Sequence, residues 1–114
     1  MGRRMTLEQK TLDDIVHRIV EVAHPEKIIL FGSAARGEMG AHSDVDLLII
    51  KGGVDSLDLM AVIYRNLHGV GAAVDAIVVR PEDVERFKDS HALVIKPALK
   101  EGKVIYDAAG SLVA

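Results

Sequence analysis

Apolar side chains recur at helical intervals in four parts of the chain. The clearest case lies between Leu12 and Ala23, where they return every three or four positions after the sequence TLEQ at 6–9, the pattern of a helix-capping box. Pro25 ends this helix, and glycines or acidic first turns mark the limits of the others. Helices are therefore expected over residues 7–23, 56–67, 81–88 and 91–100, and Pro97 must kink or restart the last one.

Short runs of β-branched and aliphatic residues between these helices are typical of strands. Strands are expected over residues 27–31, 44–51, 73–79 and 104–106. Residues 47–50 are apolar at every position, so both faces of that strand should be buried. The alternation of helices and strands favours an α+β (α/β-like) fold with a small mixed sheet flanked by helices. Residues 1–114 are expected to form one domain with a loose tail at about 107–114.

The composition narrows the classes of function. The chain is 49% hydrophobic and 27% charged with a net charge of −3, and it contains no cysteine. An acidic balance with only 4% aromatic residues disfavours a nucleic-acid-binding module, which needs basic and stacking side chains. The basic N-terminus is not followed by an apolar segment, and no apolar run approaches the ~20 residues of a membrane span. A cytoplasmic protein without membrane contact is expected.

Two aspartates, Asp44 and Asp46, begin the strand expected at 44–51. Alternate side chains of a strand share a face, so both carboxylates should point the same way. Two carboxylates at ~4 Å repel each other by about 4 kcal/mol at an effective dielectric of about 20, and a bound cation removes that cost. Oxygen ligands suit Mg²⁺ or Mn²⁺, which commonly bind together with phosphates. The pair therefore indicates a nucleotide site, although surface strands also carry such pairs without a function.

A third carboxylate, Asp75, lies within the apolar strand expected at 73–79. Burying it there is costly unless it is paired or binds a metal. If the strands at 44–51 and 73–79 are neighbours, Asp75 could join Asp44 and Asp46 in a triad. One ion between the first two would hold a triphosphate, and a second, shared with Asp75, would activate the attacking hydroxyl. Asp75 could also act as the general base, or be simply a paired core aspartate.

A Gly32–Ser33 turn follows the strand expected at 27–31. The spacing from Gly32 to Gly37 matches a P-loop, but Glu38 and Met39 stand where a P-loop needs Lys and Ser or Thr, so that interpretation fails. The turn can still direct backbone N–H groups and a hydroxyl at a phosphate. Arg36 could bind phosphate or a site carboxylate, or be an ordinary surface arginine after a strand–helix turn.

Other side chains have plainer interpretations. Tyr64 and Tyr106 are expected to pack with their rings and to place their hydroxyls in water. The apolar residues at 93–95 and Leu99 are either core or a contact surface for a partner or a second copy, which leaves a homo-oligomer open.

At this point the chain resembles a known family. The segments GSAARG at 32–37 and SDVDL at 43–47 look like the GS-x-ARG and SD-x-D-L motifs of the DNA polymerase β-type nucleotidyltransferase superfamily. The size and order of elements resemble its minimal branch, the MNT proteins, which are often paired with a HEPN-domain partner as a toxin–antitoxin system. The resemblance covers nearly the whole chain, including the leading helix, the third aspartate and the closing GKVIY at 102–106.

The resemblance implies a polymerase β-type fold and assigns roles to particular residues. Its catalytic and metal-binding triad maps onto Asp44, Asp46 and Asp75, and its nucleotide-binding residues map onto Gly32, Ser33, Arg36 and Ser43. It implies two Mg²⁺ ions (or Mn²⁺) and transfer of a nucleoside monophosphate from an NTP to a hydroxyl, with release of pyrophosphate.

For the MNT branch, the resemblance implies transfer of AMP from ATP to a tyrosine of a HEPN ribonuclease toxin, which neutralises the toxin. The chain also lacks the extra domain with which antibiotic nucleotidyltransferases hold their acceptor, so a partner protein is expected to supply it. The alternative is a non-catalytic antitoxin that masks its partner by binding.

Overall fold

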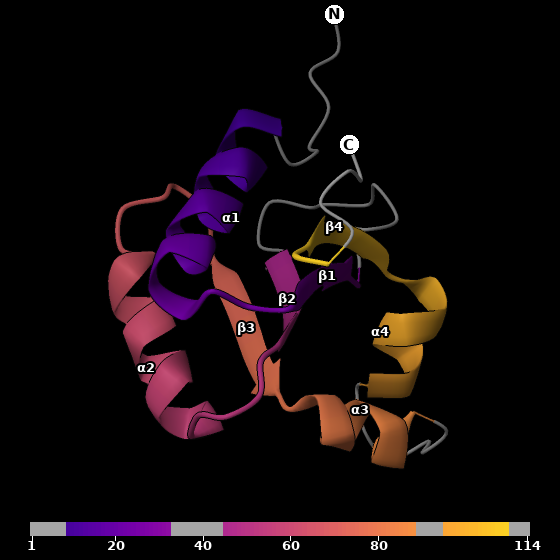
Figure 1. Cartoon of the computed structure of the whole chain (residues 1–114). Coiled ribbons are helices and arrows are strands. Elements are labelled where there is room, and N and C mark those ends of the chain that lie inside the picture. Colours follow the sequence, from indigo (N-terminus) through magenta and orange to yellow (C-terminus); the bar gives the residue numbers. More distant parts are fainter. Residues whose placement is uncertain (1–8, 33–44, 89–94, 110–114) are drawn as a thin grey trace, which may run out of the picture.

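The computed structural model describes residues 9–32, 45–88 and 95–109, which form a mixed sheet between helices (Figure 1). Along the chain the elements are α1 (Gln9–Ala23), β1 (Lys27–Phe31), β2 (Val45–Ile50), α2 (Ser56–Asn66), β3 (Val74–Val79), α3 (Pro81–Phe87), α4 (Ile95–Glu101) and β4 (Lys103–Asp107). This α+β arrangement confirms the expected fold class, and the element limits agree with the sequence-based ones to within a few residues. Residues 6–8 of the expected capping box and residues 91–94 of the helix expected at 91–100 lie outside the described residues.

The sheet has the strand order β3-β2-β1-β4 and is mixed. β1 pairs antiparallel with both β2 and β4, whereas β2 and β3 are parallel. Parallel neighbours need a long crossover, which here contains α2. The register runs from Val45 opposite Val74 to Ile50 opposite Val79, so β2 and β3 start level with each other. The strands that carry Asp46 and Asp75 are therefore neighbours, which meets the condition on which the predicted triad depends.

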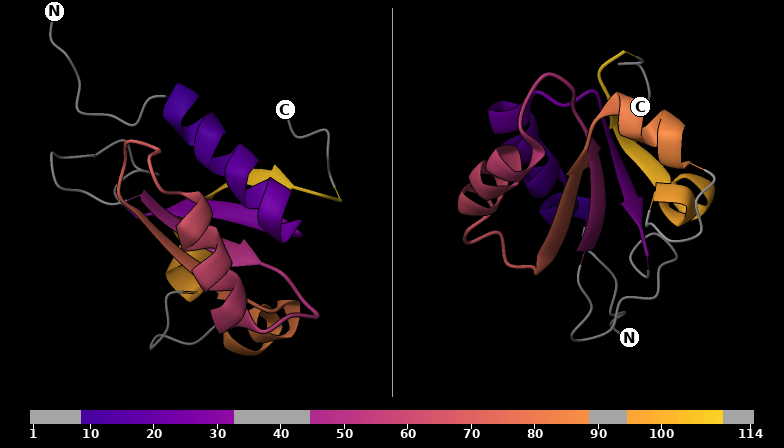
Figure 2. Two further views of the ribbon diagram at one scale, coloured as in Figure 1. Left: turned by 90° about the vertical axis from the view of Figure 1, so that its left-hand side faces the viewer. Right: turned by 90° about the horizontal axis from the view of Figure 1, so that it is seen from below.

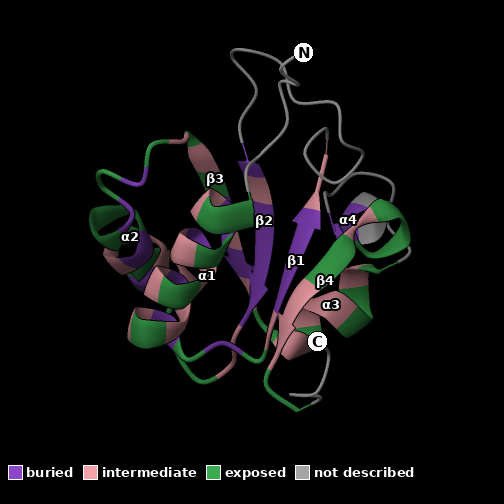
Figure 3. Ribbon diagram, turned by 90° about the horizontal axis from the view of Figure 1, so that it is seen from above, coloured by how far each residue is buried: buried purple, intermediate pink, exposed green. Residues whose placement is uncertain are grey.

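Helices cover both faces of the sheet, as the views along and across it show (Figure 2). α1 and α2 lie on one face and α3 and α4 on the other, and the central strands are buried between them (Figure 3). Leu47, Leu48 and Ile49 of β2 have no exposed surface, as expected for a strand that is apolar on both faces.

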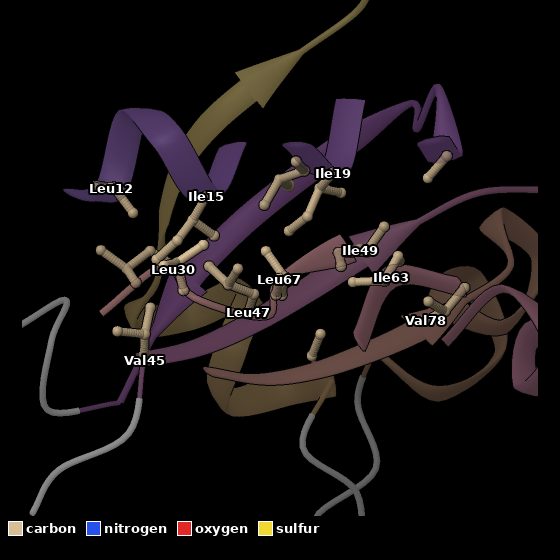
Figure 4. Close-up of a cluster of buried hydrophobic side chains, with 14 of the residues drawn as sticks. Leu12, Ile15, Ile19, Leu30, Val45, Leu47, Ile49, Ile63, Leu67 and Val78 are labelled. Carbon is tan, nitrogen blue, oxygen red and sulfur yellow. The ribbon is translucent and has the colours of Figure 1, made fainter. Parts of the chain in front are cut away.

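The larger core lies under α1 and α2 (Figure 4). Ile15 and Ile19 of α1 and Ile63 of α2 are fully buried against alternate residues of the strands. The smaller core joins α4 to the opposite face and contains the other set of alternate strand residues. Its buried members are Ile29, Leu48, Ile50, Ile95 and Ala98. Of the residues left open above, Ile95 is thus core and Leu99 is exposed.

Two arginines fix helix ends. Arg18 of α1 donates from Nη1 to the carbonyls of Asn66 (3.2 Å) and His68 (3.0 Å), which caps the C-terminus of α2. At the start of α3, the backbone N–H of Arg80 donates to Asp83 (3.2 Å). The Arg80 guanidinium also hydrogen-bonds Asp83 and holds the pKa of that carboxyl below its ordinary value. The Arg18 contacts join α1 to the end of α2, and the Arg80 contacts join the first turn of α3 to the residue before it.

In the part of the chain that the structure describes, none of the helices has the length and apolar character to cross a bilayer.

Gly102, between α4 and β4, has no space for a side chain. A Cβ at this position would collide with the carbonyl oxygen of Ala98 and lie 2.9 Å from that of Leu30. Both contacts are with backbone, which cannot move aside cheaply. We expect Gly102→Ala to lower the free energy of unfolding by about 1–3 kcal/mol, measured by urea denaturation. An unchanged denaturation midpoint would show that α4 is not held against β1 in this way.

Candidate active site

The described aspartates of the predicted triad meet at one end of the sheet. Asp46 and Asp75 are the second residues of β2 and β3, and the parallel register places them directly opposite each other. Phe31, the last residue of β1, is the antiparallel partner of Asp46. Because neighbouring strands are only about 4.8 Å apart, no other side chain separates the two carboxylate-bearing positions.

The two aspartates share the face of the sheet that α3 and α4 cover. Two residues further along, Leu48 and Ile77 pack in the smaller core on that face, and strand side chains alternate with a period of two. Ile29, Leu48 and Ile77 form the next row across the sheet, so the carboxylates stand at the margin of an apolar layer. Asp46 is half-buried and Asp75 is exposed.

The expectation that Asp75 is a buried carboxylate is wrong. β3 is an edge strand of the sheet, and its first residues are only partly covered. The apolar run around Asp75 reflects the buried Ala76 and Val78, whose side chains point to the other face. The cost of burying a charge therefore gives no argument that Asp75 has a function. Its position opposite Asp46 is the observation that points to a site.

Gly32 lies directly against the Asp46 carboxylate. Its φ of +75° is in the left-handed region that favours glycine. In addition, a Cβ on Gly32 would collide with Oδ2 of Asp46 and lie 3.3 Å from its Cγ. The positive φ favours glycine here, and the absence of a side chain lets the Asp46 carboxylate lie directly against the backbone of residue 32. The structure thus brings Gly32, the described residue of the predicted phosphate-binding turn, against Asp46, a predicted metal ligand.

The remaining predicted site residues are Ser33, Arg36, Ser43 and Asp44, which lie outside the described residues. Within the described ranges, no group of three or more His, Asp or Glu side chains is placed to hold a metal ion. The described donor set is the carboxylate pair of Asp46 and Asp75. It fits Mg²⁺, which is usually bound through one or two carboxylates while phosphates and water complete its octahedron.

Sequence reasoning missed one member of this site, Tyr64 of α2. Its hydroxyl lies 3.3 Å from Oδ1 of Asp75 and 3.3 Å from the carbonyl oxygen of Ala76, and it accepts a hydrogen bond from the Ala76 N–H at 2.8 Å. The expectation that this hydroxyl contacts only water is therefore wrong. Helical spacing alone could not reveal the contact, because it depends on where the crossover places α2 beside β3.

Comparison with known proteins identifies the family. Residues 13–110 match the model of the polymerase beta nucleotidyltransferase domain. A curated relative from Methanocaldococcus jannaschii, named "Putative protein adenylyltransferase MJ0604", is 34% identical over 102 residues, which cover 87% of this chain and 98% of that protein. The chain belongs to the polymerase β-type nucleotidyltransferase family, and its general activity is nucleotidyl transfer.

Solved structures confirm the fold. A chain from the complex of tri-AMPylated Shewanella oneidensis HEPN toxin with MNT antitoxin superposes with a TM-score of 0.59 at 12% identity, covering 90% of this chain and 75% of that one. A chain of a toxin–antitoxin complex with AMP-PNP gives a TM-score of 0.61 at 14% identity, with coverages of 84% and 73%.

The carboxylate pair should destabilise the protein when no metal is bound. In EDTA, we expect Asp75→Asn to raise Tm by about 1–4 °C, because like charges on directly opposed strand residues cost up to about 1 kcal/mol. Asp13→Asn, on the exposed side of α1, is the matched charge-removal control and should leave Tm nearly unchanged. A lower Tm for Asp75→Asn would mean that the pair does not repel.

Substitution of Gly32 tests the contact between the turn and Asp46. We expect Gly32→Ala to lower Tm, because an alanine at this positive φ costs about 1–2 kcal/mol of backbone strain. We also expect it to displace the Asp46 carboxylate, because the added Cβ collides with Oδ2. Calorimetry with Mg²⁺ and a non-hydrolysable ATP analogue should then show much weaker binding by the folded variant. Binding at wild-type affinity would remove Gly32 from the site.

Proposed function

We propose that this chain transfers AMP from ATP to a hydroxyl of a partner protein, a HEPN ribonuclease toxin, and thereby acts as its antitoxin. Asp44, Asp46 and Asp75 bind two Mg²⁺ ions, and Gly32, Ser33, Arg36 and Ser43 bind the triphosphate. Residues 1–114 act as one catalytic domain in this proposal, and the partner supplies the acceptor.

The observation that carries the proposal is the juxtaposition of Gly32, Asp46 and Asp75 at one end of the sheet in a member of this family. A turn limited to glycine, in contact with one of two opposed carboxylates, suits a site that takes a metal-bound phosphate. Three relatives support the choice of nucleotide and acceptor. One is named "Putative protein adenylyltransferase", one comes from a toxin–antitoxin complex solved with AMP-PNP, and one comes from a complex of an AMPylated HEPN toxin with an MNT antitoxin.

In the proposed reaction, the acceptor oxygen attacks the α-phosphorus of ATP. A bond forms between that oxygen and phosphorus, and the bond from phosphorus to the leaving pyrophosphate oxygen breaks. The acceptor proton passes to the Asp75 carboxylate or through it to water. Mg²⁺ at the aspartates would offset the negative charge of the triphosphate and of the carboxylates themselves.

The chain contributes position and charge. Asp46 is fixed by strand pairing on both sides, with Phe31 opposite it on β1 and Asp75 on β3. Gly32 places backbone, not a side chain, directly beside the Asp46 carboxylate. Phosphoryl transfer depends mainly on such positioning and electrostatic stabilisation.

The direct test is to incubate the chain with ATP, Mg²⁺ and a HEPN-domain protein encoded beside it, and to measure intact masses. We expect the partner to gain mass in multiples of one AMP unit. Asp46→Asn should abolish the mass gain of the partner, because the variant loses the charge and one carboxylate oxygen. The variant should keep the wild-type circular dichroism spectrum, because Asn has the same shape as Asp. Asp13→Asn is the matched control and should transfer normally.

A tight complex with no mass gain from ATP or any other NTP would contradict catalysis. In that case the masking antitoxin becomes the better explanation, and Asp46→Asn should protect against the toxin as well as the wild type does.

A further inference from the structure

Tyr64 lies at this site but has no role in the proposed reaction as described above. It lies on α2, on the opposite side of the sheet from α3 and α4, yet its hydroxyl reaches the edge of β3. Odd-numbered residues of β3 direct their backbone groups toward β2, as the carbonyls of Ala73 and Val79 do. Ala76 therefore turns its N–H and C=O to the open edge of the sheet, where the Tyr64 hydroxyl contacts both.

The single hydroxyl proton faces two acceptors at the same distance. The Ala76 carbonyl and Oδ1 of Asp75 are each 3.3 Å from Oη, whereas the Ala76 N–H already occupies one Oη lone pair at 2.8 Å. A carboxylate is the stronger acceptor because it is charged. The N–H contact fixes the hydroxyl oxygen in space, so its proton is available to Asp75 from a defined position.

We propose that Tyr64 is a positioning residue for Asp75, holding one carboxylate oxygen so that the other is presented to the metal and the acceptor. This inference rests on the proposed function. Asp75 is exposed on an edge strand, and the contact of its Oδ1 with a fixed hydroxyl favours one side-chain rotamer. Ligating carboxylates are commonly oriented by such hydrogen bonds, and loss of the partner typically costs 10–100-fold in metal affinity or activity.

A purely structural role is the competing explanation, in which the hydroxyl only closes the β3 edge at Ala76. The two roles predict different effects of removing the hydroxyl. An edge-closing hydroxyl affects stability alone, whereas a positioning hydroxyl affects metal binding and only when Asp75 is a carboxylate.

The test is Mn²⁺ binding in the presence of a non-hydrolysable ATP analogue, followed by electron paramagnetic resonance. We expect Tyr64→Phe to weaken Mn²⁺ binding about 10-fold while the ring remains in place. Tyr106→Phe, at the only other tyrosine, is the matched control and should bind as the wild type does. In an Asp75→Asn background, Tyr64→Phe should cause no further loss.

Wild-type affinity in Tyr64→Phe would overturn the inference and leave the proposed function intact, even if its Tm falls. A loss that persists in the Asp75→Asn background would also overturn it, since the hydroxyl would then act elsewhere. If the wild-type protein binds no Mn²⁺ with the analogue, the proposed function fails and the inference with it.

A second readout does not depend on the variant folding. With ¹³C-labelled tyrosine in the wild-type protein, the Cζ resonance of Tyr64 should shift when Mg²⁺ and the analogue bind, and that of Tyr106 should not. Saturating binding without a Tyr64 shift would contradict the positioning role.

Discussion

The parallel pairing of β2 with β3 is the constraint on which the site depends. It places Asp46 opposite Asp75 with only an interstrand spacing between them. The hydrophobic pattern fixes this register. A shift of one residue would move Leu47, Leu48 and Ile49 to the wrong faces of two packed cores. Hydrophobic burial on both sides of β2 therefore keeps the two carboxylate-bearing residues opposite each other at its start.

The surrounding elements bring further groups to the two aspartates. β1 pairs antiparallel with β2 and ends beside the same carboxylate, so that the Gly32 turn meets Asp46 without a side chain between them. The crossover helix α2 is capped by Arg18 and carries Tyr64 to the β3 edge. The proposed site groups thus come from three adjacent strand ends held by regular secondary structure, which suits chemistry that depends on positioning.

Much of this could be predicted from the sequence. The periods of 3.6 and 2 located the elements, and the fully apolar run at 47–50 indicated a central strand. Asp46 and Asp75 could be proposed as partners only on the condition that their strands are neighbours, because spacing does not determine strand order. Because the strand order was not known, Asp75 was wrongly expected to be buried, and the contact between Tyr64 and Asp75 could not be foreseen. Both errors concern the sheet edge, which local patterns do not reveal.

The central claim is that the opposed carboxylates form a metal–nucleotide site. Anomalous diffraction from crystals grown with Mn²⁺ and a non-hydrolysable ATP analogue tests it most directly. We predict a Mn²⁺ peak within about 2.0–2.3 Å of Asp46 oxygens and of a phosphate oxygen, with Asp75 coordinating this ion or a second one beside it. A bound analogue with Mn²⁺ remote from both aspartates, or no binding at this end of the sheet, would contradict the account.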